Sequence, residues 1–177
     1  MTVDSLHDPL RLRPTMLSDL DFVLGVERDP ANLPSITPWE RTQHEGAVRF
    51  PDFRHFIVEA GAGTQAAGFV ILQGCRSPQR AVELKRIVLQ RKGEGLGRAC
   101  VRRLKQLAFR DLRAHRFWLD VKAGNVRAQS LYVSEGFVVE GTLRDAVRVE
   151  GGYESLIVMA MLEAEYAQRV AAGLEPG

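Results

Sequence analysis

Three glycines at alternate positions, Gly93, Gly95 and Gly97, follow a strand-like segment and precede a helix-like one, with basic residues on both sides. Glycine has no Cβ, so the backbone can turn tightly there and approach a ligand closely. The first amides of the following helix would be free, and the helix dipole favours an anion beside them. The segment therefore predicts a site for a phosphate-bearing ligand. The alternative is a glycine-rich turn that only separates a strand from a helix.

The spacing of these glycines differs from that of the common nucleotide-binding loops. The dinucleotide fingerprint has two residues before its last glycine, and a reading from Gly95 puts Cys100 at that last position. The phosphate loop of nucleotide hydrolases ends in Gly-Lys-Ser/Thr, whereas this chain has Gly-Arg-Ala. Neither ATP nor NAD is expected here.

A second segment, residues 125–137, reads Asn-Val-Arg-Ala-Gln-Ser-Leu-Tyr-Val-Ser-Glu-Gly-Phe. Asn125 can cap a helix that places Ala128, Leu131 and Tyr132 on adjoining turns of one face. Gly136 can take the left-handed conformation that ends such a helix. Taken alone, the segment predicts a capped helix with a buried aromatic residue.

Together, the two segments resemble the signatures of the GCN5-related N-acetyltransferases (GNAT). Residues 92–97 resemble the family's coenzyme A loop, Gln/Arg-x-x-Gly-x-Gly/Ala, with Lys92 in place of the first residue. Residues 125–137 match the second signature, Asn-x-x-Ala-x-x-Leu-Tyr-x-x-x-Gly-Phe, at every position. Residues 137–145 are similar to the branch that acetylates ribosomal-protein N-termini and polyamines.

The resemblance implies a fold and an activity. The fold would be α/β (α+β), with a mixed, mostly antiparallel central sheet and helices on both faces. The activity would be transfer of an acetyl group from acetyl-CoA to a primary amine, by direct attack in a ternary complex. Acceptors would be a protein N-terminus, a polyamine or another small amine. The alternative function is a non-catalytic acyl-CoA-binding sensor or interaction module.

The resemblance also implies residue roles. Tyr132 would be the general acid that protonates the departing thiolate, and the Val88 amide would polarise the thioester oxygen. The expected cofactor-binding residues lie on the strand, in the loop and at the two helix starts: Ile87, Val88, Leu89, Lys92, Gly93, Glu94, Gly95, Leu96, Gly97, Arg98 and Asn125.

A base must deprotonate the acceptor, because a lysine-like amine has a pKa of about 10.4. Glu83 is the predicted base, with Asp120 on the neighbouring strand as its competitor. Strand alternation puts Glu83 and Lys85 on the same side, so Glu83 could equally be half of an ion pair. In this family the acceptor usually enters between the first two helices and the final hairpin. Glu27 and Trp39 lie in that region and would bind a cationic amine, unless they only form a solvated helix face.

Bulk properties narrow the function further. The chain has 177 residues, with 24 basic and 22 acidic residues and a net charge of +2, which argues against nucleic-acid binding. The longest apolar run, 156–162, is too short to cross a bilayer, and no secretory signal is expected at the N-terminus. The two cysteines and four histidines lack metal-ligand spacing, so no metal is predicted. A cytoplasmic location is expected. The resemblance also implies a homodimer, since members of the family are often dimers.

The elements that would position these residues follow from hydrophobic periodicity and turn residues. The pattern predicts one domain over 1–177, with a core at about 10–162 and a helical tail at 163–177. Ser18 is expected to cap the first helix and Pro38 to open the second. Helices are predicted at 18–28, 38–49, 96–112 and 125–135, and strands at 10–13, 55–60, 67–73, 82–89, 116–123, 137–142 and 155–162. A turn is predicted at 61–63.

Overall fold

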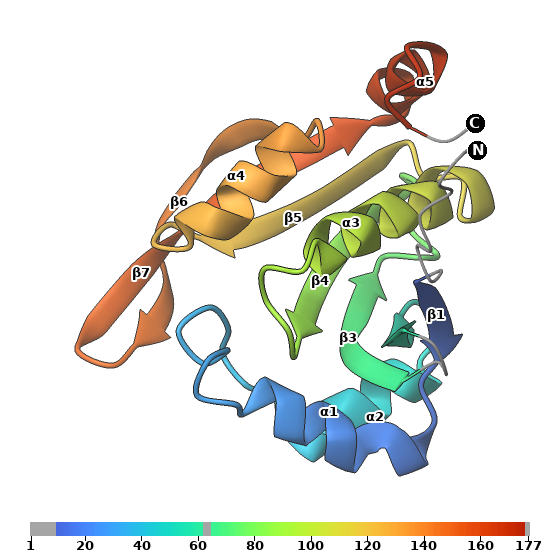
Figure 1. Ribbon diagram of the computed structural model, residues 1–177. Helices are drawn as coiled ribbons and strands as arrows, with labels where there is room; N and C mark the ends of the chain where they lie inside the picture. Colours follow the sequence, from blue (N-terminus) through green and yellow to red (C-terminus); the bar gives the residue numbers. More distant parts are fainter. Residues whose placement is uncertain (1–9, 62–64, 176–177) are drawn as a thin grey trace, which may run out of the picture.

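A seven-stranded sheet with the strand order β1-β2-β3-β4-β5-β7-β6 runs through the computed structural model, which describes residues 10–61 and 65–175 (Figure 1). Only the β4–β5 pair is parallel, and the other five neighbouring pairs are antiparallel. The mostly antiparallel mixed sheet is therefore confirmed. The strands are β1 (Arg11–Pro14), β2 (Arg54–Ala60), β3 (Gln65–Gln73), β4 (Ala81–Leu89), β5 (Arg116–Lys122), β6 (Val138–Val149) and β7 (Gly152–Leu162).

Helices cover both faces of this sheet, as predicted. The helices α1 and α2 lie on one face, and α3 and α4 lie on the other (Figure 1). We call these the α1/α2 face and the α3/α4 face. The helices are α1 (Leu20–Glu27), preceded by the short 3-10 turn η1 (Leu17–Asp19), then α2 (Arg41–Arg49), α3 (Leu96–Gln106), which continues as a π-helical turn η2 (Leu107–Asp111), α4 (Val126–Ser134) and α5 (Glu163–Ala171).

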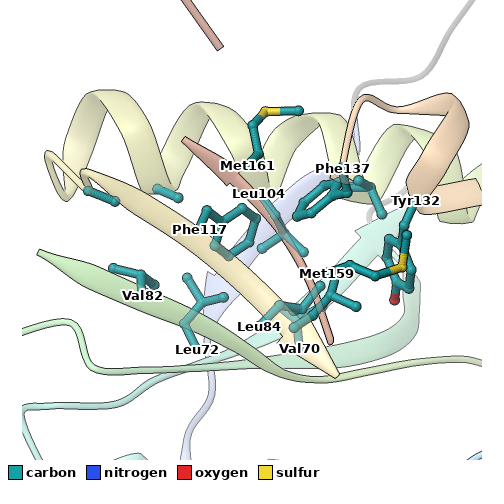
Figure 2. Close-up of a cluster of buried hydrophobic side chains, with 14 of the residues drawn as sticks. Val70, Leu72, Val82, Leu84, Leu104, Phe117, Tyr132, Phe137, Met159 and Met161 are labelled. Carbon is teal, nitrogen blue, oxygen red and sulfur yellow. The ribbon is translucent and has the colours of Figure 1, made fainter. Parts of the chain in front are cut away.

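Strand alternation divides the apolar side chains into two cores. Along β3, Val70 and Leu72 point to the α3/α4 face, whereas Phe69 and Ile71 point to the α1/α2 face. The core of the α3/α4 face contains Leu84, Leu104, Phe117, Tyr132, Phe137 and Met159 (Figure 2). The core of the α1/α2 face contains Leu20, Val23, Ile57 and Val88. Each face is thus held by its own buried cluster, which fixes the helices that carry the candidate site.

Several predicted boundaries are wrong by a few residues. Ser18 lies inside the 3-10 turn, and α1 begins at Leu20 rather than at a serine cap. The second helix begins at Arg41 instead of Pro38, because the Glu40 amide donates to the Gln43 side chain at 2.8 Å and starts the helix there. The helical tail ends at Ala171 instead of continuing to residue 177.

The final hairpin is longer than predicted. Strand β6 continues to Val149 instead of stopping at 142, and β7 begins at Gly152. The strand is hidden because its register with β7 shifts twice, between Val139 and Gly141 and between Leu143 and Val147, which breaks the regular alternation of apolar residues. The predicted turn at 61–63 lies partly outside the described residues. Among residues 10–61 and 65–175, no helix combines the length and apolar character that a membrane span requires.

Candidate active site

The parallel strands β4 and β5 pair over only three residues and then separate. Ala81 to Glu83 pair with Arg116 to Trp118, and no pairing follows beyond that point. From there β4 stays with β3 and β5 stays with β7 (Figure 1). The later residues of β4, including Ile87, Val88 and Leu89, therefore keep an edge that no described strand pairs with. An extended ligand arm can use the backbone groups of such an edge as an added strand would.

A β-bulge in β4 changes which side chains reach the α1/α2 face. Ile71 pairs with Arg86, but the next β3 residue, Leu72, pairs with Leu84, so Lys85 is an extra residue. Lys85 and Arg86 consequently both reach the α1/α2 face. Lys85 lies 3.1 Å from Glu83 on that face, and Arg86 donates to Glu27 of α1.

The loop between β4 and α3 has the backbone that an anion site needs. Gly93 and Gly95 have φ values of +93° and +77°, a left-handed conformation that favours glycine. Gly95 is the N-cap of α3, so the first amides of this helix follow at once and have no partner within the helix. At Gly97, a Cβ would lie 3.4 Å from Leu131 Cδ2, so a small residue lets α3 approach α4. Together with the free edge of β4, this loop fits the pyrophosphate and arm of coenzyme A.

The basic residues predicted for the cofactor are engaged within the protein. Lys92 Nζ donates to the carbonyl of Ala31. Arg98 Nη1 donates to Glu135 Oε1 at 2.5 Å and to Ser134 Oγ at 3.1 Å. Glu94, in the loop itself, lies 3.8 Å from Arg91.

Sequence reasoning missed one basic residue beside the loop. Arg127 Nη2 lies 3.8 Å from the position that a Cβ at Gly93 would occupy. Arg127 belongs to the first turn of α4, directly after the cap residue Asn125. Its place inside the second signature was the signal available, but in that segment only Asn125 and Tyr132 were given functional roles.

Helix α4 holds Tyr132 with its ring in the core of the α3/α4 face. Asn125 Oδ1 accepts from the Ala128 amide at 3.2 Å, so the predicted cap is confirmed. The Tyr132 residue is 6% exposed, and its ring packs 5.7 Å from that of Phe137 (Figure 2). The hydroxyl has no hydrogen-bond partner among the described residues, and it is not sealed from solvent. Burial raises the pKa of Tyr132, so the phenol stays protonated at neutral pH and can donate a proton.

Two carboxylates lie on the α1/α2 face where the strands separate. Glu83 is 9% exposed, and burial raises its pKa, while Lys85 opposes that shift and the nearby charge of Asp120 adds to it. Phe117, Leu119 and Val121 point to the opposite core, so strand alternation puts Asp120 on the same face as Glu83. A carboxylate with a raised pKa is a better proton acceptor than a free one.

Glu27, predicted to bind the acceptor, is completely buried with both oxygens engaged. Its Oε1 accepts from Arg86, and its Oε2 accepts from the Trp39 amide at 3.0 Å and from His44 Nε2 at 3.0 Å. The other predicted acceptor residue, Trp39, stacks its ring against the Arg86 guanidinium, 4.8 Å from the ring centroid. A direct contact between Glu27 and an amine would therefore require one of these partners to move.

Two histidines extend the network of Glu27 into the protein. His44 Nδ1 lies 3.2 Å from His55 Nε2, and His55 Nδ1 lies 2.8 Å from Thr15 Oγ1. Because the carboxylate of Glu27 only accepts, His44 Nε2 is the donor in the contact between them. Burial, followed by the charge of His44, lowers the pKa of His55 to about 3, so this ring is neutral. Sequence reasoning assigned no metal-binding role to either histidine, and no sequence pattern indicated that the two rings would contact each other.

The loop between α1 and α2 spans the two separated strands. The Thr37 carbonyl of this loop accepts a hydrogen bond from Arg86 of β4 at 2.9 Å, and its Pro34 carbonyl accepts one from Lys122 of β5 at 3.3 Å. Lys92, just after β4, donates to the same loop. The loop lies by the ends of both strands (Figure 1). The gap between β4 and β5 thus has Tyr132 on its α3/α4 side and Glu83, Asp120 and this loop on the other.

Known proteins share both the sequence and the fold. Residues 9–138 match the model of the acetyltransferase (GNAT) domain. A spermidine N(1)-acetyltransferase of Vibrio cholerae serotype O1 is 31% identical over 117 residues, which is 66% of this chain and 67% of that protein.

Solved structures of spermidine N-acetyltransferase from Vibrio cholerae are similar over nearly the whole chain. The complex with CoA and spermine has a TM-score of 0.81 and 26% identity, and covers 90% of this chain and 98% of that one. A dodecameric structure has a TM-score of 0.77 and 26% identity, and covers 91% and 98%. The domain match, the shared fold and the free edge of β4 beside the glycine loop agree, and the chain belongs to the GNAT family as an N-acetyltransferase.

Proposed function

We propose that this enzyme transfers the acetyl group of acetyl-CoA to a primary amine by direct attack in a ternary complex. The observation that carries the proposal is the separation of β4 from β5 beyond Glu83, with a phenol on one side of the gap and two carboxylates on the other. The acyl donor would enter from the α3/α4 side and the acceptor from the α1/α2 side. Such an arrangement brings the two substrates together without a covalent enzyme intermediate.

The cofactor would be held mainly by backbone groups. The amides at the start of α3 and the glycine loop would hold the pyrophosphate, with Arg127 beside them. The free edge of β4, from Ile87 to Leu89, would pair with the pantetheine arm, and the Val88 amide would polarise the thioester oxygen. Asn125 would keep the first turn of α4 in place next to this arm.

Two proton transfers complete the reaction. The amine nitrogen forms a bond to the acetyl carbon while the carbon–sulfur bond breaks, and the amine proton goes to Glu83 directly or through water. Tyr132 gives its proton to the departing thiolate. The raised pKa of Glu83 supports the role of a base, and the raised pKa of Tyr132 supports the role of an acid. Asp120 remains the competing base.

The acceptor class rests on the relatives and on the site. The similar proteins act on spermidine, and one of them binds spermine. A cationic amine suits the carboxylates of Glu83 and Asp120 by Coulomb attraction. Polyamines, other small amines and protein N-termini are the candidate acceptors. The cytoplasmic location and the homodimer stay predictions.

A test combines binding with turnover. Calorimetry should detect binding of CoA and acetyl-CoA, and a thiol-release assay with a panel of amines should show amine-dependent turnover. Initial rates with both substrates varied should give intersecting lines, as a ternary complex requires. Parallel lines, which indicate a covalent acetyl-enzyme, would contradict direct attack. Binding of acetyl-CoA without turnover of any amine would instead favour the sensor.

A further inference from the structure

Arg86 is fixed on the α1/α2 face through one end of its guanidinium group. Its Nη1 donates to Glu27 Oε1 and to the Thr37 carbonyl, the latter at 2.9 Å. The ring of Trp39 supports the guanidinium plane at 4.8 Å. Contacts with Glu27 of α1 and with Thr37 and Trp39 of the α1–α2 loop therefore set the orientation of the Arg86 side chain, which is only 9% exposed.

The network behind Glu27 makes this orientation rigid. Glu27 cannot turn away, because the Trp39 amide and His44 Nε2 both donate to its other oxygen. His44 in turn is held by His55, whose ring stacks on Phe69 with an interplanar angle of 17°. A rotation of Arg86 would break buried hydrogen bonds to a charged group, each of which is costly to leave unmade.

The other edge of the Arg86 guanidinium is free. Its Nε and Nη2 atoms make no hydrogen bond with the described residues, and neither belongs to the buried polar atoms that lack a partner. Both atoms therefore reach solvent. Their N–H groups point in parallel and match the two oxygens of a carboxylate, the arrangement in which arginine binds anions most strongly.

This free edge lies near the carboxylates expected to receive the amine. Arg86 follows Glu83 by three residues on β4, a distance of about 10 Å along a strand. The bulge at Lys85 turns both side chains to the same face. A small molecule with an ammonium group at Glu83 and Asp120 can thus place an anionic group against Arg86. A polyamine would instead bring a second positive charge toward a guanidinium, which repels it.

We infer that the acceptor is an amine that also carries a carboxylate, an amino acid or a close derivative, and that the Nε–Nη2 edge of Arg86 binds this carboxylate. The inference rests on the proposed function, whose acceptor class it specifies. The Glu27–His44–His55 network would then hold Arg86 so that one edge of its guanidinium group lies beside the acyl group. It also separates this enzyme from the relatives that act on spermidine.

The experiment compares matched pairs of acceptors that differ only in the carboxylate. The pairs are tyrosine and tyramine, phenylalanine and phenethylamine, and histidine and histamine, with spermidine added. For each compound kcat/KM is measured by thiol release, and binding to the enzyme–CoA complex is measured by calorimetry. Wild-type enzyme should favour the carboxylate-bearing member of its best pair by about tenfold or more, mostly through KM.

Two variants keep the test independent of folding. The double variant Glu27→Gln/Arg86→Gln removes the buried pair as a unit, so no unpaired charge remains, and it should lose the preference. Arg86→Lys keeps the charge but not the parallel donors, and it should lose most of the preference. Arg41→Gln, at an exposed arginine of α2 that pairs with Asp21, is the matched control and should keep it. Circular dichroism and CoA affinity report whether each variant is folded.

The outcomes are distinct for the two proposals. If the wild type acetylates spermidine or the decarboxylated amines as well as the amino acids, the inference is overturned and the proposed function stands. The inference is also overturned if a folded double variant keeps the wild-type preference. If acetyl-CoA binds and no amine of the panel is acetylated, the proposed function fails, and this inference fails with it.

Discussion

The two faces of the split sheet are built in different ways. On the α3/α4 face, one continuous stretch from β4 to α4 supplies the glycine loop, the helix start and Tyr132, and backbone groups do most of the expected binding. On the α1/α2 face, Arg86 and Glu27 come from segments 59 residues apart and meet only in the folded protein. Backbone groups can bind a ligand that all members of a family share, because they do not depend on residue type. An acceptor that differs between members has to be recognised by side chains, and a buried network is needed to fix the positions of these side chains.

This contrast predicts that a substitution on one face changes the binding or chemistry of that face and leaves the function of the other face intact. Glu27→Ala should have the largest effect, because it leaves the Arg86 guanidinium buried without a carboxylate and His44 without an acceptor. The expected loss in the free energy of unfolding is about 3–5 kcal/mol, measured by urea denaturation. CoA affinity should be nearly unchanged in protein that is still folded. Glu45→Ala, in a partly exposed pair with Arg41, is the control and should cost less than about 1 kcal/mol.

Tyr132→Phe should have the next largest effect and should alter chemistry alone. Removal of the hydroxyl leaves the packing against Phe137, but no proton donor remains for the thiolate. We expect kcat to fall by about a hundredfold or more, while calorimetry gives an unchanged Kd for acetyl-CoA. Tyr153→Phe, at an exposed tyrosine of β7, should behave as wild type. A normal kcat in Tyr132→Phe would exclude this residue as the acid.

Gly95→Ala should weaken cofactor binding with little effect on acceptor preference. A Cβ at a φ of +77° strains the N-cap of α3 and shifts the amides that would hold the pyrophosphate. The Kd for CoA should rise by about tenfold, which corresponds to about 1.4 kcal/mol. Gly151→Ala carries similar strain, at a φ of +83°, in the distant β6–β7 turn. If that variant weakens CoA binding equally, general destabilisation explains the effect and the loop does not.

The smallest effect expected is a pH dependence of stability that arises from His55. Its pKa is lowered to about 3 in the folded protein, so below about pH 6.5 the unfolded chain binds a proton that the folded chain does not. Stability should therefore be complete above that pH and fall as the pH drops, by about 1.2 kcal/mol between pH 7 and pH 5.5. Urea denaturation across this range should show a flatter profile for His55→Gln than for wild type. His115→Gln, at an exposed histidine, should keep the wild-type slope.

Local sequence patterns predicted much of the fold, including the elements that carry one half of the candidate site. The elements from β4 to α4 were predicted in order, and the Asn125 cap was confirmed, because each depends on neighbours within one or two turns. The Glu83–Lys85 contact followed from strand alternation and was also confirmed. Errors lie where a non-local feature decides the boundary, as in β6, whose pairing with β7 includes two register shifts that break strand alternation.

Local sequence patterns could not predict the side-chain contacts of the α1/α2 face. The alternation of a regular strand would turn Arg86 away from Lys85, and only the bulge brings both to one face. Glu27 looked like an exposed acidic residue near the end of a helix, and its burial depends on three partners from other segments.

The sequence by itself determined a glycine loop before a helix and a capped helix with a tyrosine, because these depend on backbone freedom and short-range hydrogen bonds. Tertiary structure alone decided that β4 parts from β5, that Glu27 is buried among three partners, and which edge of the Arg86 guanidinium keeps free donors. Strand pairing and burial join segments that are distant in the chain, and no short window of residues contains that information.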